Sequence, residues 1–227
     1  MIYDTAKLAC FFSNENPKEC IARRMRAASA GPAGAGGVPD INECETAAMD
    51  RTESGPCTKI IVSSGSSAHD KALAYAYRGV FMVTSGLSRD HQERAHSDAT
   101  KAMHLDPKVG EAYFVLGFLA SDLGPYWSPR AGILYLDRAI AVGLPPGLLG
   151  PAYMFRAIDH RVLGNATHDK SQYQLAIDDY GQQLQIDPNN ADSYAARASI
   201  EQKLGQVAAA QSDLATSNRL KKTGNAQ

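Results

Sequence analysis

The chain has 227 residues, a net charge of -1 at pH 7 and 44% hydrophobic residues. This content is enough for a sizeable core, and the near-zero charge gives no electrostatic basis for binding nucleic acid. No stretch reaches the length of about 18 apolar residues that a bilayer requires, so the sequence predicts no integral membrane segment.

The first segment, residues 1–39, predicts no regular fold. Its last part, AASAGPAGAGGVP (27–39), is too rich in glycine, alanine and proline to hold a regular element, so we expect an irregular or disordered segment that ends in a linker. The apolar run at residues 8–12 is too short for the core of a signal peptide. We therefore expect a periplasmic or secreted protein if the true start lies upstream, and a cytoplasmic one otherwise.

A short helical hairpin is predicted for residues 40–66. Asp40 or Asn42 can cap its first helix, and Cys57 lies at the start of its second, with a Ser-Gly-Pro break between the two. Cys44 and Cys57 would then lie one on each arm.

Four later segments share one pattern. Each begins with a small residue and a tyrosine, has a glycine or alanine four positions after that tyrosine, and ends in glycine. They are AYAYRGVFMVTSG (74–86), AYFVLGFLASDLG (112–124), AYMFRAIDHRVLG (152–164) and SYAARASIEQKLG (193–205). A second helical pattern follows each segment, with a small residue at Ala95, Gly132, Ala176 or Ala210. Small residues at helical spacing allow two helices to lie close together.

This pattern resembles the tetratricopeptide repeat (TPR) family over residues 67–222. The fourth copy is close to the family's repeat of about 34 residues, and the first three are longer. The resemblance implies an all-α, TPR-type solenoid of about four helical hairpins, preceded by the short hairpin, with a concave binding groove. It implies no catalytic residues and no cofactor. The expected repeats are 67–107, 108–146, 147–188 and 189–222, followed by a tail at 223–227.

The cysteines carry a second resemblance. A cysteine, about a dozen residues, Cys-Thr-x-Ile-Ile and then Ala-Tyr-x-x-Arg-Gly resembles the front end of a group of exported bacterial TPR proteins. This resemblance implies a disulfide between Cys44 and Cys57, and the alternative is two buried reduced thiols. No pair has C-x-x-C spacing, which argues against zinc or thioredoxin-like chemistry.

No catalytic motif stands out in the chain. His91 and His96 are five residues apart and do not share a helix face as a metal-binding pair would, and no H-E-x-x-H, G-x-S-x-G or phosphate-loop motif occurs. We therefore predict no enzyme and no metal. The alternative is a thiol-dependent or hydrolytic enzyme that uses the N-terminal cysteines, which a lowered thiol pKa would favour.

The concave groove is the remaining candidate for function. Positions that line it in TPR proteins correspond here to Ala76, Val80, Val83, Phe114, Phe118, Ser121, Met154, Ile158, Arg161, Ala195, Ser199 and Gln202. Ala76 and Val80 stand where TPR domains that grip chaperone C-termini have carboxylate-binding Lys and Asn, so that function is not expected. The mostly apolar row predicts an unidentified protein or peptide partner. The alternatives are that another part of the chain fills the groove, or that the chain associates with an identical copy.

Three connections are also predicted. GLPPGLLGP (143–151) should join the second and third repeats, and NATHDKSQ (165–172) should form a long loop inside the third. The only tryptophan, Trp127, lies in a proline-stiffened loop, where we expect it to pack on the repeat edge; the alternative is an exposed contact residue.

Overall fold

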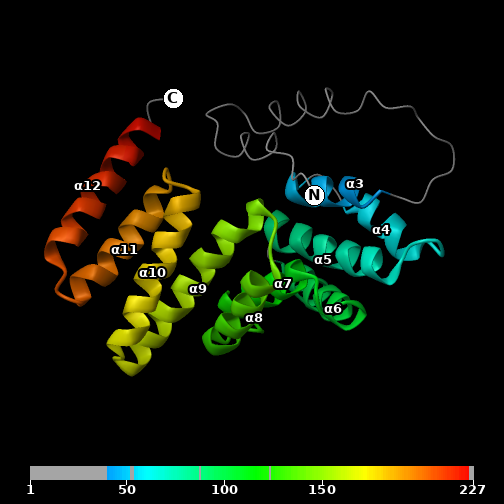
Figure 1. Cartoon of the computed structure of the whole chain (residues 1–227), viewed down its shortest axis with the longest axis horizontal. Helices are drawn as coiled ribbons and strands as arrows, with labels where there is room; N and C mark the ends of the chain where they lie inside the picture. The colour runs from blue at the N-terminus through cyan, green and yellow to red at the C-terminus, as the bar shows by residue number, and fades with distance from the viewer. Residues whose placement is uncertain (1–39, 52–53, 87, 123, 225–227) are drawn as a thin grey trace.

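The structure is a computed structural model that describes residues 40–51, 54–86, 88–122 and 124–224 (Figure 1). The predictions for residues 1–39 and for the end of the tail, 225–227, lie outside the described residues. Within the described residues every regular element is an α-helix. These helices are α3 (Ile41–Met49), α4 (Gly55–Val62), α5 (Ala68–Ser85), α6 (Arg89–Leu105), α7 (Gly110–Ser121), α8 (Pro129–Val142), α9 (Pro146–Thr167), α10 (Lys170–Ile186), α11 (Ala191–Lys203) and α12 (Val207–Gly224).

The helices form consecutive hairpins that stack into a solenoid. Within the hairpins α5 packs on α6, α7 on α8, α9 on α10 and α11 on α12, and each second helix also contacts the next first helix. Figure 1 shows an arch with α3 and α4 at one end and α12 at the other. The structure thus confirms the prediction of an all-α TPR-type solenoid of four hairpins preceded by a short helical hairpin.

Short polar side chains begin most of these helices. Ser67 and Asp70 form a reciprocal capping box at the start of α5, in which the Ser67 hydroxyl accepts from the Asp70 backbone and the Asp70 carboxylate accepts from the Ser67 backbone. Asp40 caps α3 by accepting a hydrogen bond of 2.9 Å from the backbone of Asn42, so Asp40 and not Asn42 is the cap. Asn190 caps α11 in the same way, after the Asp-Pro stop that ends α10.

The connections around the third repeat are shorter than predicted. GLPPGLLGP is mostly helical, because α9 begins at Pro146 and continues through Pro151 to Thr167. Pro151 is the sixth residue of α9 and has no backbone N–H to donate to the carbonyl of Gly147, so the helix continues through it with one hydrogen bond fewer. The predicted loop at 165–172 is also wrong, since α9 and α10 are separated only by His168, in the left-handed conformation, and Asp169.

α9 takes part in two of the apolar cores. Leu148 and Ala152, in its first half, belong to the larger core built by α5 to α8. Ala157, in its second half, belongs to a separate core with residues of α10 and α11. One 22-residue helix therefore joins the first two repeats to the last two.

The N-terminal hairpin packs on α5 and reaches further along the inner side of the array. Cys44, Ala48, Cys57 and Ile60 are buried against Ala74 and Tyr77 of α5. Met49, at the end of α3, packs against the larger core and lies close to Gly147, at the start of α9. α3 therefore covers part of the inner side of the first two repeats.

The loop between α7 and α8 is anchored by a different aromatic residue from the one predicted. Trp127 is 47% exposed, so the prediction that it packs on the repeat edge is wrong. Tyr126 instead stacks on His96 of α6, with ring centroids 4.3 Å apart and planes within 3°. The stacked pair holds the loop on the first repeat and leaves the neighbouring indole in solvent.

Candidate interaction surface

A polar cluster recurs inside three of the four hairpins. In each, an arginine of the first helix donates two hydrogen bonds to an aspartate of the second helix and lies over a tyrosine three residues before it. We call these clusters forks; they are Tyr75–Arg78–Asp98, Tyr153–Arg156–Asp179 and Tyr194–Arg197–Asp213.

The forks are built alike. Arg78 donates to Asp98 at 2.7 and 3.0 Å, and its guanidinium lies 5.5 Å from the ring centre of Tyr75. The three aspartates are buried, and their charge is neutralised by a two-point, charge-assisted contact. Each fork therefore fixes the two helices of its hairpin in one register.

Two of the arginines also reach back to the preceding hairpin. The remaining nitrogen of Arg156, Nη1, donates to Asp137 of α8 at 2.7 Å, and Nη1 of Arg78 donates to Thr58 of α4 at 3.2 Å. In the fourth repeat Nη1 of Arg197 points toward Gly181 of α10, which occupies the position equivalent to Asp137 but offers no acceptor. The forks thus link neighbouring hairpins as well as the helices within one hairpin.

The second repeat has no fork. Leu116 replaces the arginine, and Tyr135 of α8 stands where the other second helices have aspartate. Tyr113 instead lies under Arg138, whose guanidinium carbon is 5.7 Å from the ring centre. This hairpin is held by close apolar packing, because a Cβ on Gly117 would lie only 2.6 Å from Cγ of Leu136.

Four residues of the predicted groove do not line an accessible surface. Val80 is 1% exposed and Phe114 2%, and Ala76 and Val83 are also buried. All four lie in apolar cores shared with neighbouring helices, chiefly where α5 meets α7. Their placement in the groove is therefore corrected: these positions form the contact between successive repeats.

The other predicted groove residues keep contact with solvent. Phe118, Ser121, Met154, Ile158, Arg161 and Ala195 are half-buried, and Ser199 and Gln202 are exposed. This gradient follows from what covers each helix. α7 packs on α5 and α9 on α7, whereas α11 packs chiefly on α10 and α12 and covers the corresponding face of α9 only in part.

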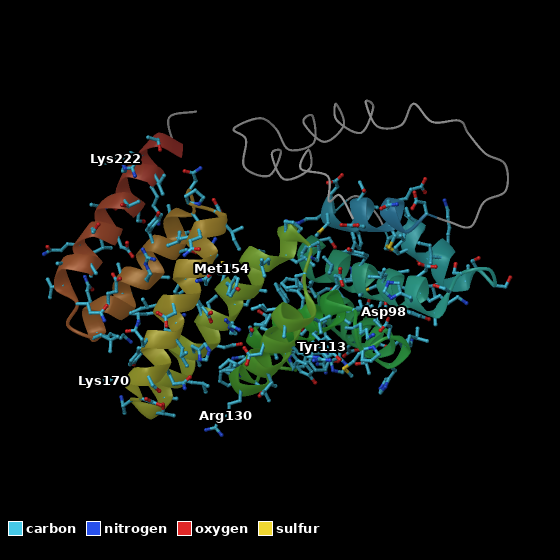
Figure 2. The ribbon with its side chains drawn as sticks, in the orientation of Figure 1. Asp98, Tyr113, Arg130, Met154, Lys170 and Lys222 are labelled. Carbon is cyan, nitrogen blue, oxygen red and sulfur yellow. A yellow bond between two sulfur atoms is a disulfide. The ribbon has the colours of Figure 1, made fainter. Side chains whose placement is uncertain are left out.

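An aromatic pair that sequence reasoning missed lies between α7 and α9. The ring of Phe118 meets the ring of Phe155 edge to face, with centroids 4.6 Å apart. Phe155 adjoins Met154 in the chain, and neighbouring residues do not share a helix face. The position of Phe155 could have been predicted from its spacing, because Leu148, Ala152 and Phe155 recur at helical intervals on the side of α9 that faces α7. Figure 2 shows the side chains along this part of the array, with Met154 labelled.

One hollow on the surface lies away from these residues. It is an open hollow of about 440 Å³ between α8, α9 and α10, and none of the predicted groove residues lines it. Its walls are Asp137, Tyr153, Arg156, His160, Leu175, Asp178, Asp179 and Gln182. The fork of the third repeat occupies it, and Asp137 and Asp179 already bind the guanidinium. The hollow is thus a by-product of the fork.

The two described cysteines lie at disulfide distance. The sulfur atoms of Cys44 and Cys57 are 2.10 Å apart and both residues are fully buried. In this arrangement neither presents a thiolate to solvent, which a cysteine nucleophile requires. Cys10 and Cys20, on which the enzyme alternative also draws, lie outside the described residues.

Two further observations concern residues 40–224 apart from the gaps given above. No group of three or more His, Cys, Asp or Glu there is arranged to hold a metal ion. No helix in the same part of the chain is both long and apolar enough to cross a bilayer.

The fold is similar to that of MamA, a TPR-type helical solenoid. A structure described as "Crystal structure of MamA" superposes with a TM-score of 0.57 at 18% sequence identity, covering 82% of this chain and 97% of that one. A second, "Crystal structure of MamA protein", gives 0.54 at 18% identity, with 80% and 88% covered. At this identity the similarity concerns the fold alone. No family model and no curated protein sequence matches the chain.

Proposed function

We propose that this protein is a protein-interaction scaffold, which binds a peptide or helix on the inner surface formed by α7, α9 and α11, without catalysis or a cofactor. The observation that carries the proposal is the incomplete cover of α9. Met154 and Ile158 are apolar and pack against the core of α9, α10 and α11, yet they remain partly exposed, because α11 does not pack along that face as α7 packs along α5. Apolar side chains left open between rigid helices suit the apolar face of a partner.

The composition of this surface supports the same conclusion. Phe118 and Ile158 supply apolar contact, and Ser199 and Gln202 supply a polar border on α11. An apolar centre with a polar rim is the usual composition of a protein interface. The partner would meet the third and fourth repeats, since α3 covers part of the first two.

The test is selection of peptides from a displayed library against the full chain, followed by measurement of their Kd. Ile158→Ser should weaken binding by about 1–2 kcal/mol, which is roughly tenfold, because it removes an apolar contact at the centre of the surface. Helicity and the melting temperature of the variant are measured alongside to exclude unfolding.

The matched control is Leu134→Ser on α8. Leu134 is 70% exposed and lies on α8, the second helix of its hairpin, so this change removes an aliphatic side chain of the same size without touching the proposed site. Binding that is lost in Leu134→Ser, or unchanged in Ile158→Ser, would contradict the proposal.

A further inference from the structure

One stripe of α9 faces α7 and α8, and its last member is a carboxylic acid. The stripe consists of Leu148, Ala152, Phe155 and Asp159, which recur at helical spacing. The first three pack into the larger core. Asp159 is 0% exposed, one of its carboxyl oxygens has no hydrogen-bond partner, and the other accepts a bond of 2.7 Å from the hydroxyl of Ser121.

Asp159 stands where the other three first helices are apolar. The equivalent positions in the pattern are Phe81, Leu119 and Ile200. The carboxyl fits only because α8 has a glycine opposite, since a Cβ on Gly132 would collide with it. Of the four equivalent positions, only the one at the contact between the second and third repeats carries an acid in place of an apolar side chain, and its carboxyl has one hydroxyl partner.

The titratable groups on the surrounding helices are directed elsewhere. On α7 and at its end, Glu111 accepts from Tyr77, and Asp122 accepts from Gln92. On α8, Asp137 binds Arg156, Arg138 covers Tyr113, and Arg130 is exposed. On α9, His160 binds Gln172 and Arg161 interacts with Tyr180. On α10, Asp179 binds Arg156 and Asp178 binds Gln174. Lys170, at the start of α10, is exposed. The described residues therefore offer Asp159 no cation.

We propose that Asp159 makes the contact between the second and third repeats a pH-sensitive junction, closed when the carboxyl is neutral and loosened when it is ionised. The stripe is apolar at its first end and carries a titratable carboxyl at its last. Leu148 and Ala152 hold the start of α9 to the first core at any pH, so the junction opens at the other end, where Ser121, Gly132 and Asp159 meet. Opening lets water reach the carboxylate, which the closed junction does not.

The direction follows from linkage. Burial raises the pKa of Asp159 to about 7, against the opposing effect of the Ser121 hydroxyl. An exposed aspartate has a pKa of about 4. Between these values the closed state binds the proton more tightly, so the opening equilibrium should rise by up to about tenfold per pH unit. The stabilisation of the closed junction is complete below about pH 4 and lost above about pH 7.

Hydrogen exchange of the full chain tests this, comparing wild type with Asp159→Asn at pH 5, 6, 7 and 8. Comparison at equal pH cancels the intrinsic exchange rate. We expect the wild-type to variant rate ratio for amides of α8 and the second half of α9 to rise steeply between pH 5 and 7 and then level off. The ratio for α5 and α12 should stay constant. A ratio that is independent of pH, or that rises equally in all helices, overturns the proposal.

A second variant covers the case in which Asp159→Asn does not fold. Ser121→Ala removes the one hydrogen bond that favours the ionised form, so the levelling-off should move to higher pH in Ser121→Ala relative to wild type. The matched control is Asp122→Asn. Asp122 is a carboxylate next to Ser121 that accepts a hydrogen bond from Gln92, and its replacement should not change the pH at which the exchange rate levels off. No displacement in Ser121→Ala, or the same displacement in Asp122→Asn, would also overturn the proposal.

Discussion

The missing acceptor in the fourth repeat can be supplied by Gly181→Asp. A Cβ on Gly181 would meet only Nη1 of Arg197, at 3.8 Å, and nothing else within 4 Å. That distance suits an aspartate whose carboxylate accepts from Nη1, as Asp137 accepts from Arg156 at 2.7 Å. The change therefore copies a contact that the third repeat already has.

The expected gain has two parts. Replacing glycine in a helix interior by aspartate should stabilise by a few tenths of a kcal/mol, roughly, from helix propensity. A partly exposed ion pair adds about 0.5–1 kcal/mol, and we take the lower half because Glu201 already acts on Arg197. Gly181→Asn has nearly the same shape and propensity without the charge, so the difference between the two variants measures the ion pair.

Urea denaturation of both variants, at low salt and at 1 M NaCl, is the assay. Gly181→Asp should exceed Gly181→Asn by about 0.5 kcal/mol at low salt, and the excess should shrink at high salt because exposed charges are screened. The excess should vanish when Arg197 is replaced by methionine. Equal stability of the two variants at low salt, with Arg197 intact, would refute the proposed geometry of the fork.

Three further outcomes are expected. Gly117→Leu should destabilise by about 1–3 kcal/mol or more, because the new side chain overlaps Leu136, and an unchanged melting temperature would mean that α7 and α8 do not meet at this point. Mass spectrometry of unreduced protein from an oxidising compartment should find Cys44 and Cys57 linked; reduction should then cost about 3 kcal/mol, and two free thiols in that material would exclude the bond. Arg78→Met should destabilise by about 3 kcal/mol or more, since Asp98 would remain buried without its cation, and the double variant with Asp98→Leu should recover much of the loss.

The repeating part of the fold could be predicted because its signals are local. A tyrosine, a small residue four positions later and a terminal glycine recur in register, and the structure gives each a place: Tyr153 under Arg156, and Gly117 against Leu136. The aspartates of the forks were equally regular. Asp98, Asp179 and Asp213 each follow the small residue of a second helix by three positions, a pattern that alignment of the second helices would have exposed.

The groove residues were harder to predict because exposure depends on a neighbour far away in the chain. Val80 and Ser199 occupy equivalent positions, yet Val80 is covered by α7 whereas no described helix covers Ser199 in that way. The repeat motif determines the direction in which a side chain points, but it does not determine whether a neighbouring helix covers that side chain. The length of α9 was not predicted because its prolines read locally as a break, although Pro146 stands at the first helical position, where proline is tolerated, and the helix continues through Pro151.

The shared helix α9 also limits how the chain can be divided. In an ideal repeat array each hairpin packs only on its neighbours and through equivalent contacts, so units can be deleted, duplicated or exchanged at the loops. A cut at the loop before Pro146 would separate Leu148 and Ala152 from the core that they complete, and a cut after α9 would strip α10 of its partner. The same core also joins α5 and α6 to α7, so α5 through α10 must move as one block, and the least disruptive boundary lies after α10, where α11 contributes one buried residue, Ile200, to the core of α9 and α10.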